Sequence, residues 1–276
     1  MKIAVFYENI YDGAKALNRP MDETLSSLRD AGMKLIYISA DSFRRDRTWL
    51  QPLLRELGLG IEGMHAFCDF SGEPDTLKYR ELIDLACECG AGNLLFVPGM
   101  LSGKNTLKDF EAIAAGMRRA VDYGRSKGMP ILMEDFDGLR APYNSILSLH
   151  WFMENVEGLG CAFDTGNFVM FHEDELEAYE LFRSKIVTLH LKDRSNAPRH
   201  PDDHPYTCAD GAQVFTCTVG SGFIRMTEIL KRLAASGYRG NVIAELYGED
   251  HAHILDDIYA SVEYLKGQGI GERKQQ

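Results

Sequence analysis

Short apolar runs alternate with amphipathic segments along the whole chain. The apolar runs are rich in Val, Ile, Leu and Phe, which is typical of strands buried on both faces of a parallel sheet. The segments between them repeat apolar residues at helical spacing. We expect strands over 2–7, 34–41, 60–70, 93–100, 130–136, 160–168, 186–193 and 241–248. We expect helices over 21–31, 48–57, 75–89, 107–127, 143–156, 174–183, 224–235 and 255–266.

Eight strand–helix units in succession predict an α/β protein with a single (β/α)8 TIM barrel spanning 1–276. The alternative is an open doubly wound sheet. It is disfavoured because the first strand lacks a glycine-rich phosphate turn and no composition break divides the chain. Glycines after the helices, such as Gly58 and Gly237, fit left-handed caps.

Residues 194–222 contain no convincing helix, so we expect a long loop after the seventh strand. Loops of this length at the active face of a barrel are often lids or oligomer contacts. The polar residues here fit a solvated loop better than a second metal site; they are Arg199, His200, Asp202, Asp203 and His204.

Composition narrows the function classes. The net charge of −11 opposes binding to nucleic acid or to an anionic membrane. No apolar run approaches the ~20 residues of a membrane span, and residues 1–13 resemble a first strand more than a secretory signal. A cytoplasmic location is therefore expected. The six cysteines form no CxxC pair, which predicts reduced, mostly buried thiols.

Polar residues mark the ends of four consecutive predicted strands: Glu134, Asp164, His190 and Glu245. Each follows a similar apolar lead-in, so all four should reach the same height at the carboxyl-terminal mouth of a barrel. Taken singly, each fits a salt-bridged or capping residue. Together, three carboxylates in one cavity would repel one another, and a divalent cation removes that cost. Three carboxylates with one imidazole suit Mn²⁺, Mg²⁺, Co²⁺ or Zn²⁺.

The same stretches carry a family resemblance. In order along the chain they are MEDF (133–136), FDTGN (163–167), LHLKD (189–193) and VIAELYG (242–248). Over nearly its full length the chain resembles the sugar-phosphate isomerase/epimerase family of xylose-isomerase-like barrels, which includes ketose 3-epimerases and inosose dehydratases. The resemblance implies one divalent metal ion, with Mn²⁺ expected, held by the four residues named above. It also implies that Glu134 and Glu245 act as an acid/base pair.

Physical reasoning agrees with that implication. A metal that polarises a carbonyl stabilises an enediolate, and two ionised glutamates on opposite faces can remove and return the proton beside it. The leading hypothesis is an isomerase or epimerase of a small sugar or related hydroxyketone. The alternative is a dehydratase of a cyclic ketone of the inosose or dehydroshikimate type. An apurinic-endonuclease-like phosphodiesterase, or a barrel that binds sugar without turnover, is a weaker alternative.

Departures from close relatives also matter. Tagatose 3-epimerase-like enzymes have a histidine and an arginine where this chain has Asn167 and Asn196. The predicted strand over 93–100 ends without the histidine of the endonuclease branch. Substrate contacts are expected from His65, Asn167, Lys192 and Arg194. The expected partner is a small sugar-like molecule, with no nucleic acid or membrane; a homo-oligomer is left open.

Overall fold

The strands of the computed structural model form a closed parallel barrel, in the order β1-β11-β7-β6-β5-β4-β3-β2. The structure describes residues 1–71, 78–103, 106–201, 203–246 and 251–271. The barrel strands are β1 (Ile3–Phe6), β2 (Leu35–Ser39), β3 (Gly60–Phe67), β4 (Leu94–Val97), β5 (Ile131–Met133), β6 (Gly160–Asp164), β7 (Ile186–Leu191) and β11 (Val242–Ala244). The predicted (β/α)8 fold is confirmed. Some residues named in the sequence predictions lie outside the described residues: Asp75, Asp202, Tyr247 and Gly248.

Helices follow the strands as expected, with two differences at the amino-terminal end. They are α1 (Tyr7–Ala16), α2 (Met21–Ala31), α3 (Ala40–Leu57), α4 (Lys78–Cys89), α5 (Thr106–Lys127), α6 (Ile146–Asn155), α7 (Glu175–Phe182), α8 (Met226–Ser236) and α9 (Ile254–Gly267), with a 3₁₀ turn over Phe168–Phe171. Helix α1 was not predicted, because its Asp12-Gly13 pair favours a turn. Gly13 is used for packing instead: a Cβ there would overlap Ile254 and Leu255 of α9. Helix α3 begins eight residues earlier than the sequence pattern indicates, at Ala40 rather than 48.

Two compact units make up the chain, and each is described by itself. Unit 1 holds Met1–Tyr37, Asp46–Gly60 and Thr188–Gln276. Unit 2 holds Ile38–Arg45 and Ile61–Val187. Each of the two units is therefore discontinuous in sequence. The organisation of the chain as one domain stays a prediction.

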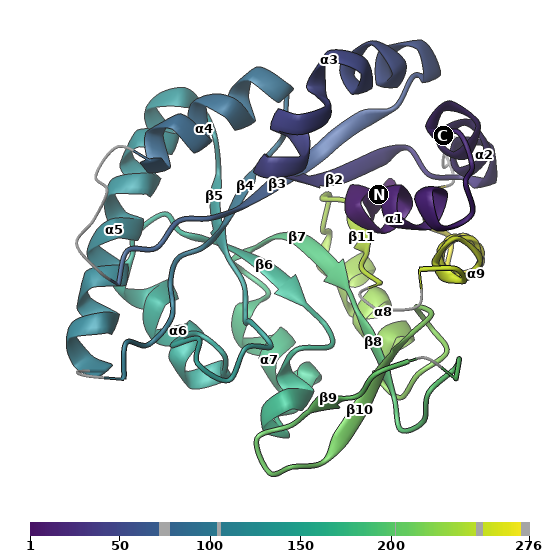
Figure 1. Cartoon of the computed structure of the whole chain (residues 1–276). Helices are drawn as coiled ribbons and strands as arrows, with labels where there is room; N and C mark the ends of the chain where they lie inside the picture. Colours follow the sequence, from purple (N-terminus) through teal and green to yellow (C-terminus); the bar gives the residue numbers. More distant parts are fainter. Residues whose placement is uncertain (72–77, 104–105, 202, 247–250, 272–276) are drawn as a thin grey trace. The chain divides into compact units, whose positions relative to one another are not determined.

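In unit 1, strand β1 pairs in parallel with both β2 and β11. Strand β11 in turn pairs with β7, with Ile243 opposite His190 and Ala244 opposite Leu191. Helix α9 packs against α1 and α2, so the last helix of the chain covers the first two (Figure 1). The residues of β1 are all buried, as its uninterrupted apolar sequence predicts.

The segment after β7 is more ordered than the loop that the sequence predicts. It contains β8 (Asp193–Ser195), β9 (Tyr206–Thr207) and β10 (Gln213–Cys217), which form a three-stranded sheet in the order β8-β10-β9. Both pairings are antiparallel, and β8 and β10 lie side by side in Figure 1. These strands are too short for their apolar pattern to stand out in the sequence.

In unit 2, strands β3, β4, β5 and β6 pair in parallel in that order. Side-chain caps fix the starts of two helices here. Ser145 and Ser148 form a capping box at α6, and Asp174 accepts hydrogen bonds from Leu176 and Glu177 at α7. These caps set where the loops after β5 and β6 end.

Cysteine chemistry and membrane topology bear on two of the sequence predictions. All six cysteines are free thiols, and Cys87 alone among them is exposed, so the prediction of reduced, mostly buried cysteines is confirmed. Within the described residues, none of the helices combines the length and apolar character that crossing a bilayer requires.

Candidate metal and catalytic site

Each unit contributes two of the four residues predicted as metal ligands. His190 and Glu245 belong to unit 1, and Glu134 and Asp164 to unit 2. All four are at least nine-tenths buried. Among the described residues, these four make up the group of acidic and histidine side chains suited to hold a metal ion. Buried charges need a partner or a metal, so this donor set fits a divalent cation.

In unit 1, Glu245 lies between two nitrogen donors of β7 and the residue that follows it. Its Oε2 is 3.1 Å from Nδ1 of His190, and its Oε1 is 2.7 Å from Nζ of Lys192. The strand register explains why these residues meet. Ile243 is paired with His190, so Glu245, two residues later, comes beside Lys192. The backbone amide of Glu245 also donates to the Leu191 carbonyl at 3.1 Å. The sequence prediction that His190 and Glu245 lie together is therefore met within this unit.

The ionisation of Glu245 follows from those neighbours. Burial by itself raises the pKa of Glu245, but the charges and hydrogen bonds of Lys192 and His190 outweigh it and hold the pKa well below its ordinary range. The carboxylate is therefore negative at neutral pH. Lys192 was expected to contact substrate; the structure gives its ammonium group a carboxylate partner.

Two aromatic rings hold the imidazole of His190. Phe6 lies edge-on to it at a centroid distance of 5.2 Å, and Tyr37 does so at 4.9 Å. Phe6 ends β1 and is paired with Tyr37 of β2, so the two rings come from adjacent strands. Because the imidazole of His190 contacts both the Phe6 ring and the Tyr37 ring, its rotation is restricted. Sequence reasoning missed these two residues, because each reads as an ordinary core aromatic.

In unit 2, Asp164 ends β6 and Glu134 follows β5. Oδ1 of Asp164 accepts a hydrogen bond from the amide of Gly166 at 2.8 Å, which fixes the carboxylate at the start of the β6 loop. Asn167 is also buried, and its Nδ2 donates to the Asp135 carbonyl at 2.8 Å. This bond ties the loop after β6 to the residue next to Glu134. Asn167 therefore has a structural contact, and its expected substrate role stays a prediction.

Tyr143 stands near Glu134 and was not singled out from sequence. Its hydroxyl donates to the Gly99 carbonyl at 3.0 Å. Burial raises the pKa of Tyr143 far above its ordinary value, and the negative charge of Glu134 raises it further. Tyr143 therefore stays a neutral hydrogen-bond donor. No charge pattern marks such a residue in the sequence.

The remaining predicted substrate contacts lie in different surroundings. His65 is half-buried on β3, with Leu95 of β4 as its paired residue. Arg194 is fully buried: its guanidinium lies 4.4 Å from the ring centroid of Tyr206, and Nη1 is 3.3 Å from Oγ1 of Thr216. These contacts place Arg194 within the β8-β10-β9 sheet. Its role with substrate stays a prediction.

Asp193 organises the segment that leads to α8. Its Oδ2 accepts from the amides of Gly220 and Gly222 at 2.9 and 3.0 Å, and its Oδ1 accepts from the amides of Arg194 and Ile224 at 2.9 and 3.2 Å. A Cβ at Gly222 would overlap Asp193 and the Arg194 carbonyl. Burial raises the pKa of Asp193, and the four hydrogen bonds oppose that rise. Asp193 thus fixes the backbone directly after Lys192.

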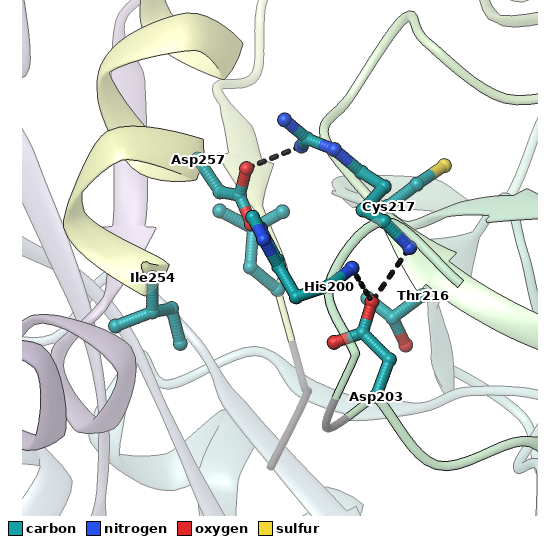
Figure 2. A pocket seen from close by; sticks show the side chains of 8 residues that line it. His200, Asp203, Thr216, Cys217, Ile254 and Asp257 are labelled. Carbon is teal, nitrogen blue, oxygen red and sulfur yellow. Dashed lines mark hydrogen bonds and ion pairs between the residues drawn. The ribbon is translucent and has the colours of Figure 1, made fainter. Parts of the chain in front are cut away.

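Arg199, His200 and Asp203 form a polar cluster beside Asp257 of α9 (Figure 2). Oδ2 of Asp203 accepts from the amides of Arg199 and His200, and the Arg199 guanidinium pairs with Asp257 of α9. The His200 ring stacks on His253 at a centroid distance of 4.1 Å. The cavity that these residues line holds about 20 Å³, enough for one water molecule. These contacts give Arg199, His200 and Asp203 an anchoring role, and the prediction of a solvated loop without a second metal stays a prediction.

Known proteins similar to this chain include two dehydratases and a sugar epimerase. An inosose dehydratase of Lacticaseibacillus casei is 27% identical over 139 residues, which is 50% of this chain and 47% of that protein, so the match spans about half of the length of the curated relative. A probable 3-DHS dehydratase of petrobactin synthesis from Bacillus anthracis superimposes with a TM-score of 0.75 at 15% identity, covering 96% of this chain and 99% of that one.

Further solved structures share the fold. A 3-keto-D-glucoside 4-epimerase from E. coli gives a TM-score of 0.69 at 15% identity, covering 96% and 99% of the two chains. The IOLI protein, crystallised with a bound zinc atom, gives 0.73 at 14% identity, covering 97% and 98%. The proteins of this fold thus include epimerases and dehydratases, and metal binding occurs among them. The model of the xylose isomerase-like TIM barrel matches residues 25–268, so the chain belongs to that family.

Proposed function

We propose that this protein is a divalent-metal-dependent isomerase or epimerase of a small sugar or related hydroxyketone. The observation that carries the proposal is the donor set. Four consecutive barrel strands, β5, β6, β7 and β11, each contribute one buried carboxylate or imidazole at or near the carboxyl end. Three carboxylates and one imidazole form a set that binds divalent cations and leaves room for substrate oxygens.

The residues fit such an ion. Glu134, Asp164, His190 and Glu245 would hold it, and Mn²⁺ is the expected ion, with Mg²⁺, Co²⁺ and Zn²⁺ as alternatives. When bound, the ion supplies Lewis-acid polarisation of a carbonyl and stabilises the negative charge that develops on its oxygen. His190 is a neutral ligand in this proposal, since an imidazolium could not coordinate. The rings of Phe6 and Tyr37 hold the His190 imidazole in its orientation.

Proton transfer falls to the two glutamates. One carboxylate takes the proton from the carbon beside the carbonyl, and the other returns a proton from the opposite face, which inverts the configuration. Lys192 keeps Glu245 ionised and fixes one of its oxygens at 2.7 Å. If a single glutamate shuttles the proton between adjacent carbons, the outcome is isomerisation.

Dehydration is the second candidate, favoured by the similarity to an inosose dehydratase and to a probable 3-DHS dehydratase. It begins with the same proton removal and differs in the next step, in which a β-hydroxyl leaves as water. Acid assistance to that leaving group would decide between the two reactions.

The experiment is a product screen in D₂O with Mn²⁺, using 3-keto-glucosides, inososes, ketoses and 3-dehydroshikimate, read by NMR after the metal is removed. Deuterium at the α-carbon without loss of water supports epimerisation or isomerisation. Loss of water supports the dehydratase instead. Binding of about three metal ions per chain, with cleavage of an abasic oligonucleotide, would favour the endonuclease.

Three variants test the assignment of the acid/base pair. Glu134→Gln and Glu245→Gln should each lower kcat at least about 10²-fold, the usual contribution of a general acid or base. Glu62→Gln is the matched control: it is a buried glutamate of β3, and its Oε2 accepts from Asn93 at 2.9 Å. Full activity in both test variants would overturn the assignment.

A further inference from the structure

Two helices of unit 2, α5 and α6, carry apolar side chains on their outer surface. Leu107 of α5 is 66% exposed, and Leu147 of α6 is 78% exposed. The rings of Phe110 and Trp151, both half-buried, meet edge-on with centroids 5.4 Å apart. Each leucine lies one helical turn before the ring on its own helix, so it shares a helix face with that ring. These four residues form one surface, the α5–α6 patch.

Contacts between the two helices fix which of their residues lie at one level. Helix α5 follows β4 and α6 follows β5, and these strands are parallel, so the helices run in the same direction. The ring contact of Phe110 with Trp151 marks a first level. A second level lies farther along both helices, where Nε of Arg118 donates to the Asn155 carbonyl at 2.9 Å. Arg118 and Glu154, next to Asn155, therefore lie beyond the patch at similar levels.

The α5–α6 patch is large enough to form the centre of a protein interface. Its two leucines and two partly exposed rings leave about 300 Å² of apolar surface in water, a size at which patches on monomers are often functional. A stable interface buries about 800 Å² on each partner, with an apolar centre and a polar rim. The patch supplies such a centre, and the charged side chains beside it supply the rim.

The charges beside the patch favour a second copy of this chain as the partner. Helix α6 contains no lysine or arginine, and Glu154 in its last turn is exposed. Helix α5 presents Arg118 and Arg119, both exposed. Opposite charges thus lie on the two halves of one surface, which makes that surface complementary to itself. A two-fold axis parallel to the helices places α5 of each copy over α6 of the other at the same level.

We propose that the α5–α6 patch is an isologous interface through which two copies of this chain form a homodimer. The leucines and rings of both copies meet at its centre, and removing them from water drives association. At the rim, Arg118 of each copy faces the partner's Glu154. These exposed ion pairs add little affinity, but they select the two-fold arrangement over others.

The test measures self-association of the full chain and locates the surface that is buried. Sedimentation equilibrium should show a dimer with a dissociation constant in the micromolar range or tighter. The chain has two tryptophans, so Trp49→Phe leaves Trp151 as the one tryptophan fluorophore. Its emission should shift to shorter wavelength as the concentration rises through the dissociation constant, because the dimer removes the indole from water.

Leu107→Glu and Leu147→Glu test the centre of the interface. Each should raise the dissociation constant of the dimer at least about 10²-fold, since the lost apolar contact occurs twice in a symmetric dimer. Both positions lie in the first turn of a helix, where a negative charge is favourable, so the monomers should fold with unchanged circular dichroism. Leu181→Glu is the matched control: this leucine, 42% exposed, lies in the last turn of α7 in the same unit, and its variant should dimerise as wild type does.

Arg118→Glu and Glu154→Lys test the two-fold arrangement. Each single change sets like charges against each other at two symmetric contacts, and should raise the dissociation constant about ten-fold. The two changes combined in one chain restore opposite charges across the interface, so the dissociation constant should return to within a few-fold of that of wild type.

Three results would overturn the inference. The first is a wild-type chain that stays monomeric at submillimolar concentration. The second is a dimer that both leucine variants leave intact, or in which the emission of Trp151 does not change, because another surface then forms the contact. The third is a combined Arg118→Glu and Glu154→Lys chain that dimerises no better than its single variants, which would refute the two-fold arrangement.

Discussion

Asp193 should be one of the most sensitive positions in unit 1 for stability. Its carboxylate accepts four backbone amides, from Arg194, Gly220, Gly222 and Ile224. Asp193→Asn keeps one oxygen for two of these donors, but turns an amide NH₂ group toward the other two. Two buried donors then lose their acceptor, at about 1–3 kcal/mol each. We therefore expect the free energy of unfolding to fall by ~2–5 kcal/mol.

The assay is urea unfolding of the metal-free protein, together with amide hydrogen exchange. Exchange at Gly220 and Gly222 should accelerate in Asp193→Asn, whereas the Val219 amide, which donates to Oγ of Ser261 at 3.1 Å, should change less. Asp210→Asn is the matched control: Asp210 is an exposed aspartate whose Oδ1 accepts from the Ala212 amide at 2.8 Å. A substitution there should stay within about 0.5 kcal/mol. Equal unfolding midpoints for Asp193→Asn and wild type would refute the reasoning.

Three further predictions concern charge and thiol chemistry. Lys192→Met should lower the stability of the metal-free protein by ~3–5 kcal/mol, because it leaves the Glu245 carboxylate buried beside one partner fewer; Mn²⁺ should restore more stability in the variant than in wild type, and equal stability in unfolding curves without metal would contradict this. Asp164→Asn should weaken Mn²⁺ binding measured by calorimetry by more than about ten-fold, since even outer-sphere partners cost 10–100-fold; an unchanged affinity would remove Asp164 from the ligand set. Iodoacetamide at pH 8 should modify the exposed Cys87 and spare Cys89. Burial raises the pKa of Cys89 to about 11, so roughly one Cys89 thiol in a thousand is ionised at pH 8. Cys89 should react only as the pH approaches 11, and equal labelling of the two cysteines at pH 8 in mass spectrometry would contradict this.

The parts of the structure that sequence reasoning reached share one property: each is encoded by a local pattern. Buried strands declare themselves as apolar runs, and the glycine after α8, Gly237, has the left-handed backbone expected of a cap, with φ of 79°. The four expected ligands are recognisable because a charged residue that ends an apolar strand is rare enough to notice. Their burial agrees with that expectation.

Features that depend on distant partners were missed. Helix α1 begins directly after β1. Its Gly13 suggests a turn in the sequence, and only the structure shows that α9 packs against this glycine. The small β8-β10-β9 sheet is held by pairings between short strands, which carry too few residues to show a period. Arg194 looks like a substrate contact in the sequence, and only the fold shows Tyr206 beneath its guanidinium. Propensity and spacing contain no information on such pairs.

The discontinuity of unit 1 has a consequence for how the chain matures on the ribosome. The amide of Lys2 donates to the side chain of Asn241, 239 residues later, and β1 pairs with β11. Strand β1 therefore leaves the ribosome long before β11, and this pairing of distant strands has to wait until β11 has been synthesised. All of unit 2 is synthesised before His190 and Glu245. His190, Lys192 and Glu245 are thus added last, so a chain truncated after β6 contains Glu134 and Asp164 but lacks His190.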